Sequence, residues 1–385
     1  MKPTFIRTSV AVVAAAGCVA AMASAAQADP PNSATSYVSP SGGGSNQDTS
    51  CADAGFATIG AAVAAAPAGG TVVVCAGTYT ESVTVDRQLT LQGMPGAVID
   101  ATGAPYGVGL AASYSTVTGL TVKNAQADEA TSAPGDGIVT GGFVNGSPVP
   151  SDHDVIVGNV TTANGGSGID VNSSNNTVVS GNNASDNIGV GINVSDDLGG
   201  PSSHNWISGN VTNRNGGGCG IALADHSGAG VFNNVVIGNT SNRNGLSTPT
   251  APDASAGSGI ILADPTPNGG VYNNKIEGNR MVQNGHGGFA MHVHAPGPNF
   301  SGNVIRDNVI GKNNLRTDAG DKRTTGIYLG DVLKLTITIS DNIIKNDQVG
   351  VFAAGPITVK GLHSNEFRHV KHQLVHTAKY AGAGG

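Results

Sequence analysis

An asparagine-rich repeat runs through most of the chain and constrains its fold more than any other feature. The unit reads Asn-x-Ile/Val-x-Gly-Asn-x-x-x-x-Asn, followed by Gly-Ile-x-Val/Leu. Its central asparagine recurs every 23 to 40 residues, at Asn159, Asn182, Asn210, Asn239, Asn279, Asn308, Asn342 and Asn365. A second column follows five residues later, at Asn164, Asn187, Asn215, Asn244, Asn284 and Asn313. Repeats of this length are typical of solenoids, in which each repeat forms one coil.

Each repeat also holds short apolar pairs with a period of two, which indicates β-strands with one buried face. Ile169/Val171 and Ile192/Val194 are examples. The coil is too long for a left-handed hexapeptide helix, and its corners are too polar for a leucine-rich horseshoe. The sequence therefore predicts an all-β, single-stranded right-handed parallel β-helix, with the asparagines stacked into hydrogen-bonded ladders.

The residues before the repeat predict a covered end for this solenoid. Apolar residues have helical spacing at Phe56, Ile59, Val63 and Ala66. An amphipathic helix here would cap the open end of the stack. We expect the β-helix over 51–375, a Ser-, Gly- and Pro-rich linker over 29–50 and a flexible tail over 376–385.

The first residues predict export. Lys2 and Arg7 precede a short apolar run, and Ala26-Gln27-Ala28 has the form of a cleavage site, so 1–28 is interpreted as a signal peptide. We therefore expect a secreted, extracellular protein.

Export makes a disulfide between Cys51 and Cys75 the expected pairing. Cys219 then has no partner. It precedes Ile221 by two positions in a strand pattern, so we expect it to point inward as a small hydrophobic residue; a reactive thiol is the alternative.

The charge balance excludes two classes of partner. Without Lys2 and Arg7, 17 basic residues face 26 acidic ones, a net charge of −9. Nucleic acid and anionic membranes are poor partners for such a chain. No segment after the leader is apolar enough to span a bilayer.

Three segments near the start resemble pectate-lyase-like and pectinesterase-like β-helix proteins. They are Phe56-Ala-Thr-Ile59, Pro67-Ala-Gly-Gly-Thr-Val-Val-Val74 and Gly77-Thr-Tyr-Thr-Glu81. With the later coils, the resemblance covers roughly 51–370, and it implies the fold and a polysaccharide or oligosaccharide partner. The Asp-Phe-Ile-Phe-Gly and Arg-Pro-Trp segments of pectinesterases are missing, which excludes that activity. Residues 284–297 resemble secreted actinobacterial β-helix proteins.

Two coils depart from the repeat at the same corner. The distance from the second asparagine to the strand glycine is usually four or five residues, but 244–259 and 313–326 are much longer. One regular coil separates them, and stacked strands lie about 4.8 Å apart. We therefore expect two walls roughly 10 Å apart, with the strand 289–294 as the floor.

The floor carries the candidate catalytic residues. Alternation turns Phe289, Met291 and Val293 inward, which turns His292 and His294 outward. Register places three neighbours around them, namely Asp225-His226, Asp264-Pro265 and, beside Ala290, Tyr328. The second wall supplies Arg316, Asp318, Asp321, Lys322 and Arg323.

Three reactions remain open for this groove. In a lyase or epimerase, His292 or His294 would remove the proton next to a uronate carboxylate, and Lys322 and Arg323 would stabilise the enolate. In a hydrolase, Asp264 and Asp321 would act as the carboxylate pair, and in a transferase a sugar hydroxyl would replace water. Substrate-binding roles are expected for His226, Asp225, Asp318, Arg316, Tyr328 and His286.

Other interpretations remain open. Asp196, Asp225 and Asp264 share one column, where each could cap its own turn or where adjacent carboxylates could bind Ca²⁺; no cofactor is required by the sequence. The histidine pair could belong to a transition-metal site. A basic column of Arg214, Arg243, Gln283 and Lys312 could face solvent or an anionic chain. The rival to an enzyme is a non-catalytic glycan-binding or structural protein of the cell surface.

Overall fold

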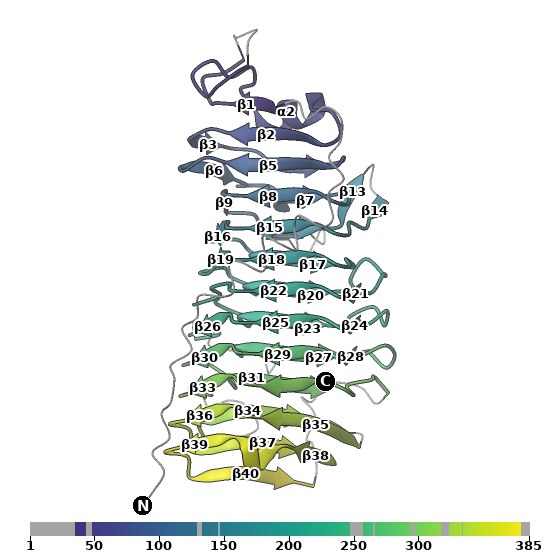
Figure 1. Cartoon of the computed structure of the whole chain (residues 1–385), viewed down its shortest axis with the longest axis vertical. Helices are drawn as coiled ribbons and strands as arrows, with labels where there is room; N and C mark the ends of the chain where they lie inside the picture. The colour runs from purple at the N-terminus through teal and green to yellow at the C-terminus, as the bar shows by residue number, and fades with distance from the viewer. Residues whose placement is uncertain are drawn as a thin grey trace, which may run out of the picture.

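The computed structural model describes residues 35–43, 48–128, 133–144, 147–246, 257–264, 266–293, 297–316, 323–332 and 334–378. The strands stack coil upon coil into one long parallel β-helix, with α2 and β1 at one end and β40 at the other (Figure 1). The predicted solenoid is therefore confirmed. No helix of these residues is long and apolar enough to cross a membrane.

Three parallel sheets form the sides of the solenoid, and the first, sheet A, has twelve strands. They are β1 (Thr35–Val38), β2 (Gly70–Val74), β5 (Leu89–Gly93), β8 (Thr116–Thr118), β15 (Val155–Val157), β18 (Val178–Ser180), β22 (Trp206–Ser208), β25 (Val235–Ile237), β29 (Lys275–Glu277), β32 (Val304–Arg306), β35 (Leu335–Ser340) and β38 (Ile357–Lys360).

Sheet B follows sheet A in each coil and consists of two five-stranded parts, which Val211 joins through single bridges to Asn183 and Thr240. The first part holds β3 (Gly77–Tyr79), β6 (Ala97–Asp100), β9 (Thr121–Lys123), β16 (Val160–Thr162) and β19 (Asn183–Ala184). The second holds β26 (Thr240–Asn242), β30 (Arg280–Val282), β33 (Val309–Gly311), β36 (Ile343–Lys345) and β39 (Glu366–Arg368).

Sheet C closes the coil and has eleven strands. They are β4 (Val83–Val85), β7 (Tyr106–Leu110), β12 (Asp136–Thr140), β17 (Ile169–Asn172), β20 (Ile192–Ser195), β23 (Ile221–Ala224), β27 (Ile260–Asp264), β31 (Phe289–Val293), β34 (Thr325–Gly330), β37 (Val349–Ala354) and β40 (His372–Thr377).

The remaining elements lie at the corners. Two hairpins pair β10 (Ala127–Asp128) with β11 (Ala133–Pro134) and β13 (Gly142–Val144) with β14 (Ser147–Val149). A short sheet joins β21 (Ser202–Ser203), β24 (Val231–Phe232) and β28 (Val271–Tyr272). The two helical segments are α2 (Ile59–Ala65) and η1 (Leu362–Ser364).

The apolar residue of each strand pair fills the interior. In sheet C, successive coils align Ile192, Ile221, Ile260 and Phe289 in register, and all four are fully buried. The core is therefore a stack of aliphatic columns, which explains why the period-two pattern alone locates the strands.

Asparagine ladders connect the corners of the coils. Along the first column each side-chain amide donates to the amide oxygen one coil on, from Asn159 to Asn365, at 2.8–3.1 Å. The second column does the same from Asn164 to Asn313. Both predicted ladders are confirmed. A third asparagine ladder, which was not predicted, joins Asn205, Asn234, Asn274 and Asn303.

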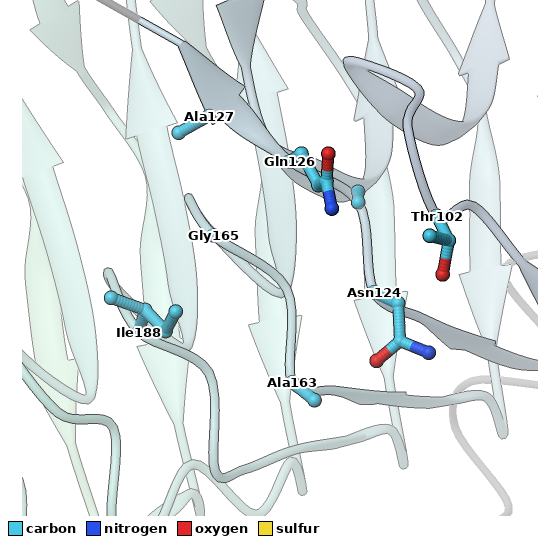
Figure 2. A pocket seen from close by; sticks show the side chains of 8 residues that line it. Thr102, Asn124, Gln126, Ala127, Ala163, Gly165 and Ile188 are labelled. Carbon is cyan, nitrogen blue, oxygen red and sulfur yellow. The ribbon is translucent and has the colours of Figure 1, made fainter.

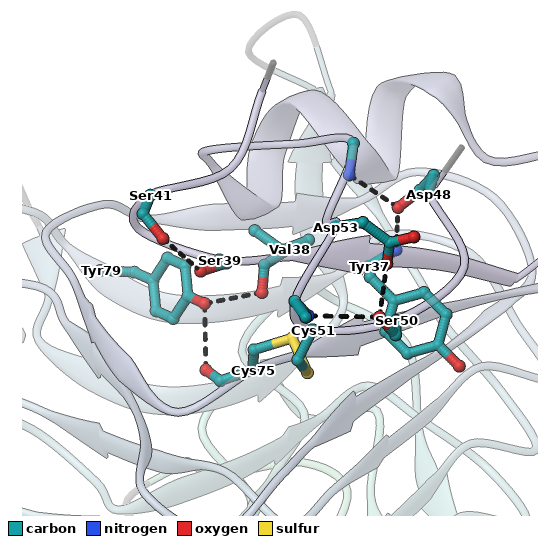
Figure 3. The surroundings of a disulfide bond; sticks show 12 residues. Tyr37, Val38, Ser39, Ser41, Asp48, Ser50, Cys51, Asp53, Cys75 and Tyr79 are labelled. Atoms are coloured by element: carbon teal, nitrogen blue, oxygen red, sulfur yellow. Dashed lines mark hydrogen bonds between the residues drawn. A yellow bond between two sulfur atoms is a disulfide. The ribbon is translucent and has the colours of Figure 1, made fainter. Parts of the chain in front are cut away.

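The N-terminal coil contains the predicted helix and disulfide. α2 buries Ile59, Ala62 and Val63 against the first coil, although its role as a cap stays a prediction. Cys51 and Cys75 form the expected disulfide, with 5.7 Å between their Cα atoms (Figure 3).

Two expectations need correction here. The predicted linker over 29–50 contains β1, which pairs with β2, because Tyr37 and Val38 continue the strand pattern despite the surrounding Ser and Gly. Likewise, β40 runs two residues into the predicted tail, to Thr377. Composition alone does not distinguish a linker or a tail from a strand that adds to an existing sheet.

Candidate functional site

The outer face of sheet C changes character along the solenoid. One outward column runs in register through Asp170, Asn193, Ala222, Ile261, Ala290, Tyr328 and Phe352. It is therefore polar on β17 and β20 and apolar or aromatic from β23 onward. Cys219 is buried, as predicted, but it packs with this outer cluster and not in the core.

The predicted floor strand is β31, and its register is as expected. Asp264 pairs with Val293 and Tyr328 pairs with Ala290. Phe289, Met291 and Val293 belong to the core. His292 lies in the alternate column, between Ala263 and Gly330, but its side chain is only 3% exposed. The strand therefore does not present His292 as an open groove floor.

The two long segments between ladder asparagine and strand glycine, 244–259 and 313–326, are called the excursions. They leave the solenoid at one corner, with one regular coil between them. Gly245 and Gly257 lie so close that a Cβ on Gly245 would come within 2.1 Å of the Cα of Gly257. The amide of His286 donates to Gly257, and that of Asn314 donates to His286. Arg316 reaches back over this coil, with its Nη1 3.5 Å from the carbonyl oxygen of Gly245. The middle parts of the excursions, 247–256 and 317–322, lie outside the described residues.

An aromatic group lies next to this corner on the outer face. The Nδ1 atom of His286 is 3.1 Å from the hydroxyl of Ser258. Its ring meets Tyr328 edge-on at 4.9 Å, and Tyr328 stacks on Phe352 at 5.5 Å. The structure thus brings His286 and Tyr328 together, although both are buried.

The aspartate column at the end of the strands holds the turns in place. Asp196 accepts backbone N–H bonds from 226, 227, 229 and 230, one coil on. Asp225 accepts from Gly228 and Gly270, and Asp264 accepts from Thr266. All three carboxylates are fully enclosed. Asp225 and Asp264 therefore cap their own turns, as predicted, whereas Asp196 binds the turn of the next coil.

Burial shifts the pKa values of these carboxyls. It raises the pKa of Asp225 to about 7 and that of Asp264 to about 6. Asp196 is also desolvated, but its hydrogen bonds from Ser227 and His226 outweigh that effect and lower its pKa. Asp196 and Asp225 share a hydrogen bond that lowers the pKa of Asp196 and raises that of Asp225, so Asp225 takes up a proton first as the pH falls.

An exposed imidazole–carboxylate pair lies beside this column. The Nδ1 atom of His226 is 2.7 Å from Oδ1 of Asp197, and the two side chains are 43% and 41% exposed. The hydrogen bond that the imidazole donates to Asp197 is the main cause of the raised pKa of His226. Asp197 was not among the predicted site residues. The pairing of Ser195 with Ala224, continued by two residues, places it beside His226.

A second group of carboxylates lies on β12 and β17. Asp136 and Asp170 are buried, and burial raises the pKa of Asp136 to about 7 and that of Asp170 as well. Asp136 accepts from the amide of Ser167 through Oδ1, and its Oδ2 has no hydrogen-bond partner among the described residues. Desolvation therefore favours the protonated form of both carboxyls.

The remaining predicted site residues divide into two groups. His294, Asp318, Asp321 and Lys322 lie outside the described residues, and so does Pro265. Arg323 is described, and its carbonyl accepts from Asn314 and Thr325 at the base of the second excursion. In the basic column, Arg214 is paired with Asp186, and Arg243 donates to Gln283.

Metal binding gains no support. Among the described residues, no three His, Cys, Asp or Glu side chains are grouped so that they could hold a metal ion. His226 follows β23, whereas His286 precedes β31 and His292 lies within it. The rings of His226 and His286 have different hydrogen-bond partners, Asp197 and Ser258.

These features define a parallel β-helix with three sheets along its sides. Similar solved structures are pectate lyase Pel9A (15% identity, TM-score 0.54, 87% of this chain and 79% of that one) and the Yersinia enterocolitica family 28 exopolygalacturonase (13% identity, TM-score 0.55, 88% and 78%). At these identities the likeness shows the fold alone.

One family model also matches. It is described as periplasmic copper-binding protein (NosD), and it matches residues 101–249. The described residues of that segment do not group into a metal site, so they do not fit a copper ion, and no step is assigned to one. No curated protein sequence matches the chain.

Proposed function

We propose that the protein is secreted and acts on a polysaccharide by proton transfer on the outer face of sheet C. The observation that carries the proposal is the His226–Asp197 pair, an exposed imidazole whose orientation is set by a carboxylate. Such a pair can exchange a proton with a ligand, and a pKa near the working pH suits that task. The disulfide supports a location outside the reducing cytoplasm.

The two sides of sheet C would hold the substrate. His226 lies after the C-terminal end of β23. The corner with Arg316 and Arg323 lies at the opposite, N-terminal ends of the sheet C strands. Strands of about five residues make this face roughly 16 Å wide, which suits a sugar chain that runs along the solenoid axis. Guanidinium groups bind carboxylates well, so a uronate polymer is the proposed substrate class.

The proposed reaction is elimination. The base removes the proton on the carbon next to the uronate carboxylate. In elimination the electron pair forms the C=C bond, the glycosidic C–O bond breaks, and the leaving oxygen takes a proton. His226 is the accessible base; His292 and His294, with Lys322 and Arg323 as cations, are the second candidate set. Hydrolysis through Asp264 and Asp321 is less favoured because Asp264 is enclosed and binds its own turn.

The test is a screen of purified protein on polyuronates and neutral glycans. Unsaturated product is read by absorbance and hydrolysis by reducing ends. We expect unsaturated product that H226A lowers at least 100-fold, the scale of a lost acid–base group. H204A, at another exposed histidine, is the control and retains activity. Loss in H292A but not in H226A would move the base to His292.

A non-catalytic glycan-binding or structural protein is the second candidate. It is favoured by the burial of His292 and Tyr328, since a reactive face would expose them. Silence in both assays, unchanged by H226A and H292A, would support this candidate.

A further inference from the structure

A depression of about 650 Å³ lies at the corner between sheets B and C, in coils nearer the N-terminal end than the two long excursions (Figure 2). Four successive coils border it. Its lining includes Thr102, Asn124, Gln126, Ala163, Gly165 and Ile188. Four coils at about 4.8 Å span roughly 14 Å, enough for two or three small rings laid along the axis.

The lining offers hydrogen-bonding groups without charge. None of the described residues that line the depression is ionised. Thr102 and Asn124 both donate to Asp100, at 2.7 and 3.0 Å, and Lys123 neutralises that carboxylate from 3.3 Å. Asp100 thus orients the two polar groups, and among the described contacts the amide oxygen of Asn124 is left for a ligand. Figure 2 shows Asn124, Gln126 and Thr102 around the hollow.

Ile188 is the unusual residue of this surface. It is 65% exposed, more than the other exposed large hydrophobic residues of the described chain. It follows a ladder asparagine, and the same position in neighbouring coils is a glycine, at Gly165, Gly216, Gly245 and Gly285. The fold therefore does not require an isoleucine there. Ile188 therefore adds an apolar surface to the depression, beside the small residues Ala163 and Gly165.

We propose that this depression binds uncharged sugar residues of a glycan chain. A sugar ring has hydroxyls on its edges and C–H groups on its faces. The amides of Asn124 and Gln126 match the hydroxyls, Ile188 matches the C–H face, and the lack of charge disfavours a uronate. The site is separate from the sheet C residues, and it rests on the proposed function only in the choice of a glycan as ligand.

Titration calorimetry on the full chain with neutral linear hexasaccharides of β-glucan, β-mannan and β-xylan tests the proposal. We expect at least one to bind with a Kd below about 1 mM, and both I188S and Q126A to weaken it about tenfold or more. V160S is the matched control, because Val160 is an exposed hydrophobic residue on β16 outside the lining. Melting curves check that each variant is folded.

Two outcomes would overturn the proposal. One is that no neutral hexasaccharide binds; the other is that I188S and Q126A, both folded, bind as the unaltered protein does. H226A separates this site from the proposed function. Neutral-sugar binding that persists in H226A while uronate turnover is lost supports both sites, and binding without any turnover supports this site alone.

Discussion

The imidazole of His226 is held by Asp197, with Nδ1 2.7 Å from Oδ1. This contact raises the pKa of His226 above 6.5, so D197N is expected to lower it towards that value. The pair stabilises the fold fully below pH 6.5, and this contribution is lost as the pH rises through the folded-state pKa. Because both side chains are largely exposed, the stabilisation is below about 1 kcal/mol. NMR titration of the imidazole in both proteins measures the shift; equal pKa values would contradict the assignment.

A ladder position occupied by a carboxylate gives a second prediction. Asp347 occupies the position after Asn313 in the second ladder, in place of an asparagine. Its Oδ1 accepts a hydrogen bond of 2.8 Å from the backbone N–H of Asn313. Burial raises the pKa of Asp347 from 3.8 to about 7. Folding therefore weakens as the pH rises from 4 to 7, by up to roughly 4 kcal/mol at about 1.4 kcal/mol per pKa unit. D347N removes this penalty. Urea unfolding at pH 4 and pH 8 is expected to show a gain for D347N only at pH 8.

The ladders themselves give the third prediction. Asn239 donates to Ile207 and Asn279 and accepts from Asn210, all out of contact with water. N239A leaves buried donors and acceptors unpaired and is expected to cost about 2–4 kcal/mol of unfolding free energy. Urea unfolding measures the loss. N268A, on an exposed turn, is the control and changes stability by less than about 0.5 kcal/mol; a similar cost in both would contradict the role of the ladder.

The parts of the fold that the sequence predicted are the parts that repeat. Ile192, Ile221 and Ile260 occupy equivalent positions because each coil must bury the same face, and the ladder asparagines recur for the same reason. Register then followed from alignment alone, and so did the pairing of Asp264 with Val293. Asp197 could have been found by extending that alignment by two residues.

What does not repeat was harder to predict. The burial of His292 depends on neighbours that no periodic pattern specifies. The hairpin of β10 and β11 leaves the same corner as the two longer excursions, but it precedes the regular asparagine pattern and so was not recognised. Alternation does not place Cys219 correctly because Cys219 lies before β23 begins, and the period of two holds only within a strand. Excursions and turns are set by contacts specific to one coil.

The corner arginine gives the last prediction, which tests substrate binding at the opposite edge of sheet C from His226. Arg316 lies at the neck of the first excursion, near Gly245 and Gly257. If it binds a uronate carboxylate equally in the ground and transition states, R316A raises KM about tenfold and leaves kcat nearly unchanged. R316K recovers part of the loss, because lysine keeps the charge but not the planar fork. R306A is the control, since Arg306 pairs with Glu277 on sheet A. Steady-state kinetics on a polyuronate measures the split; a fall in kcat with unchanged KM would assign Arg316 to the reacting centre instead.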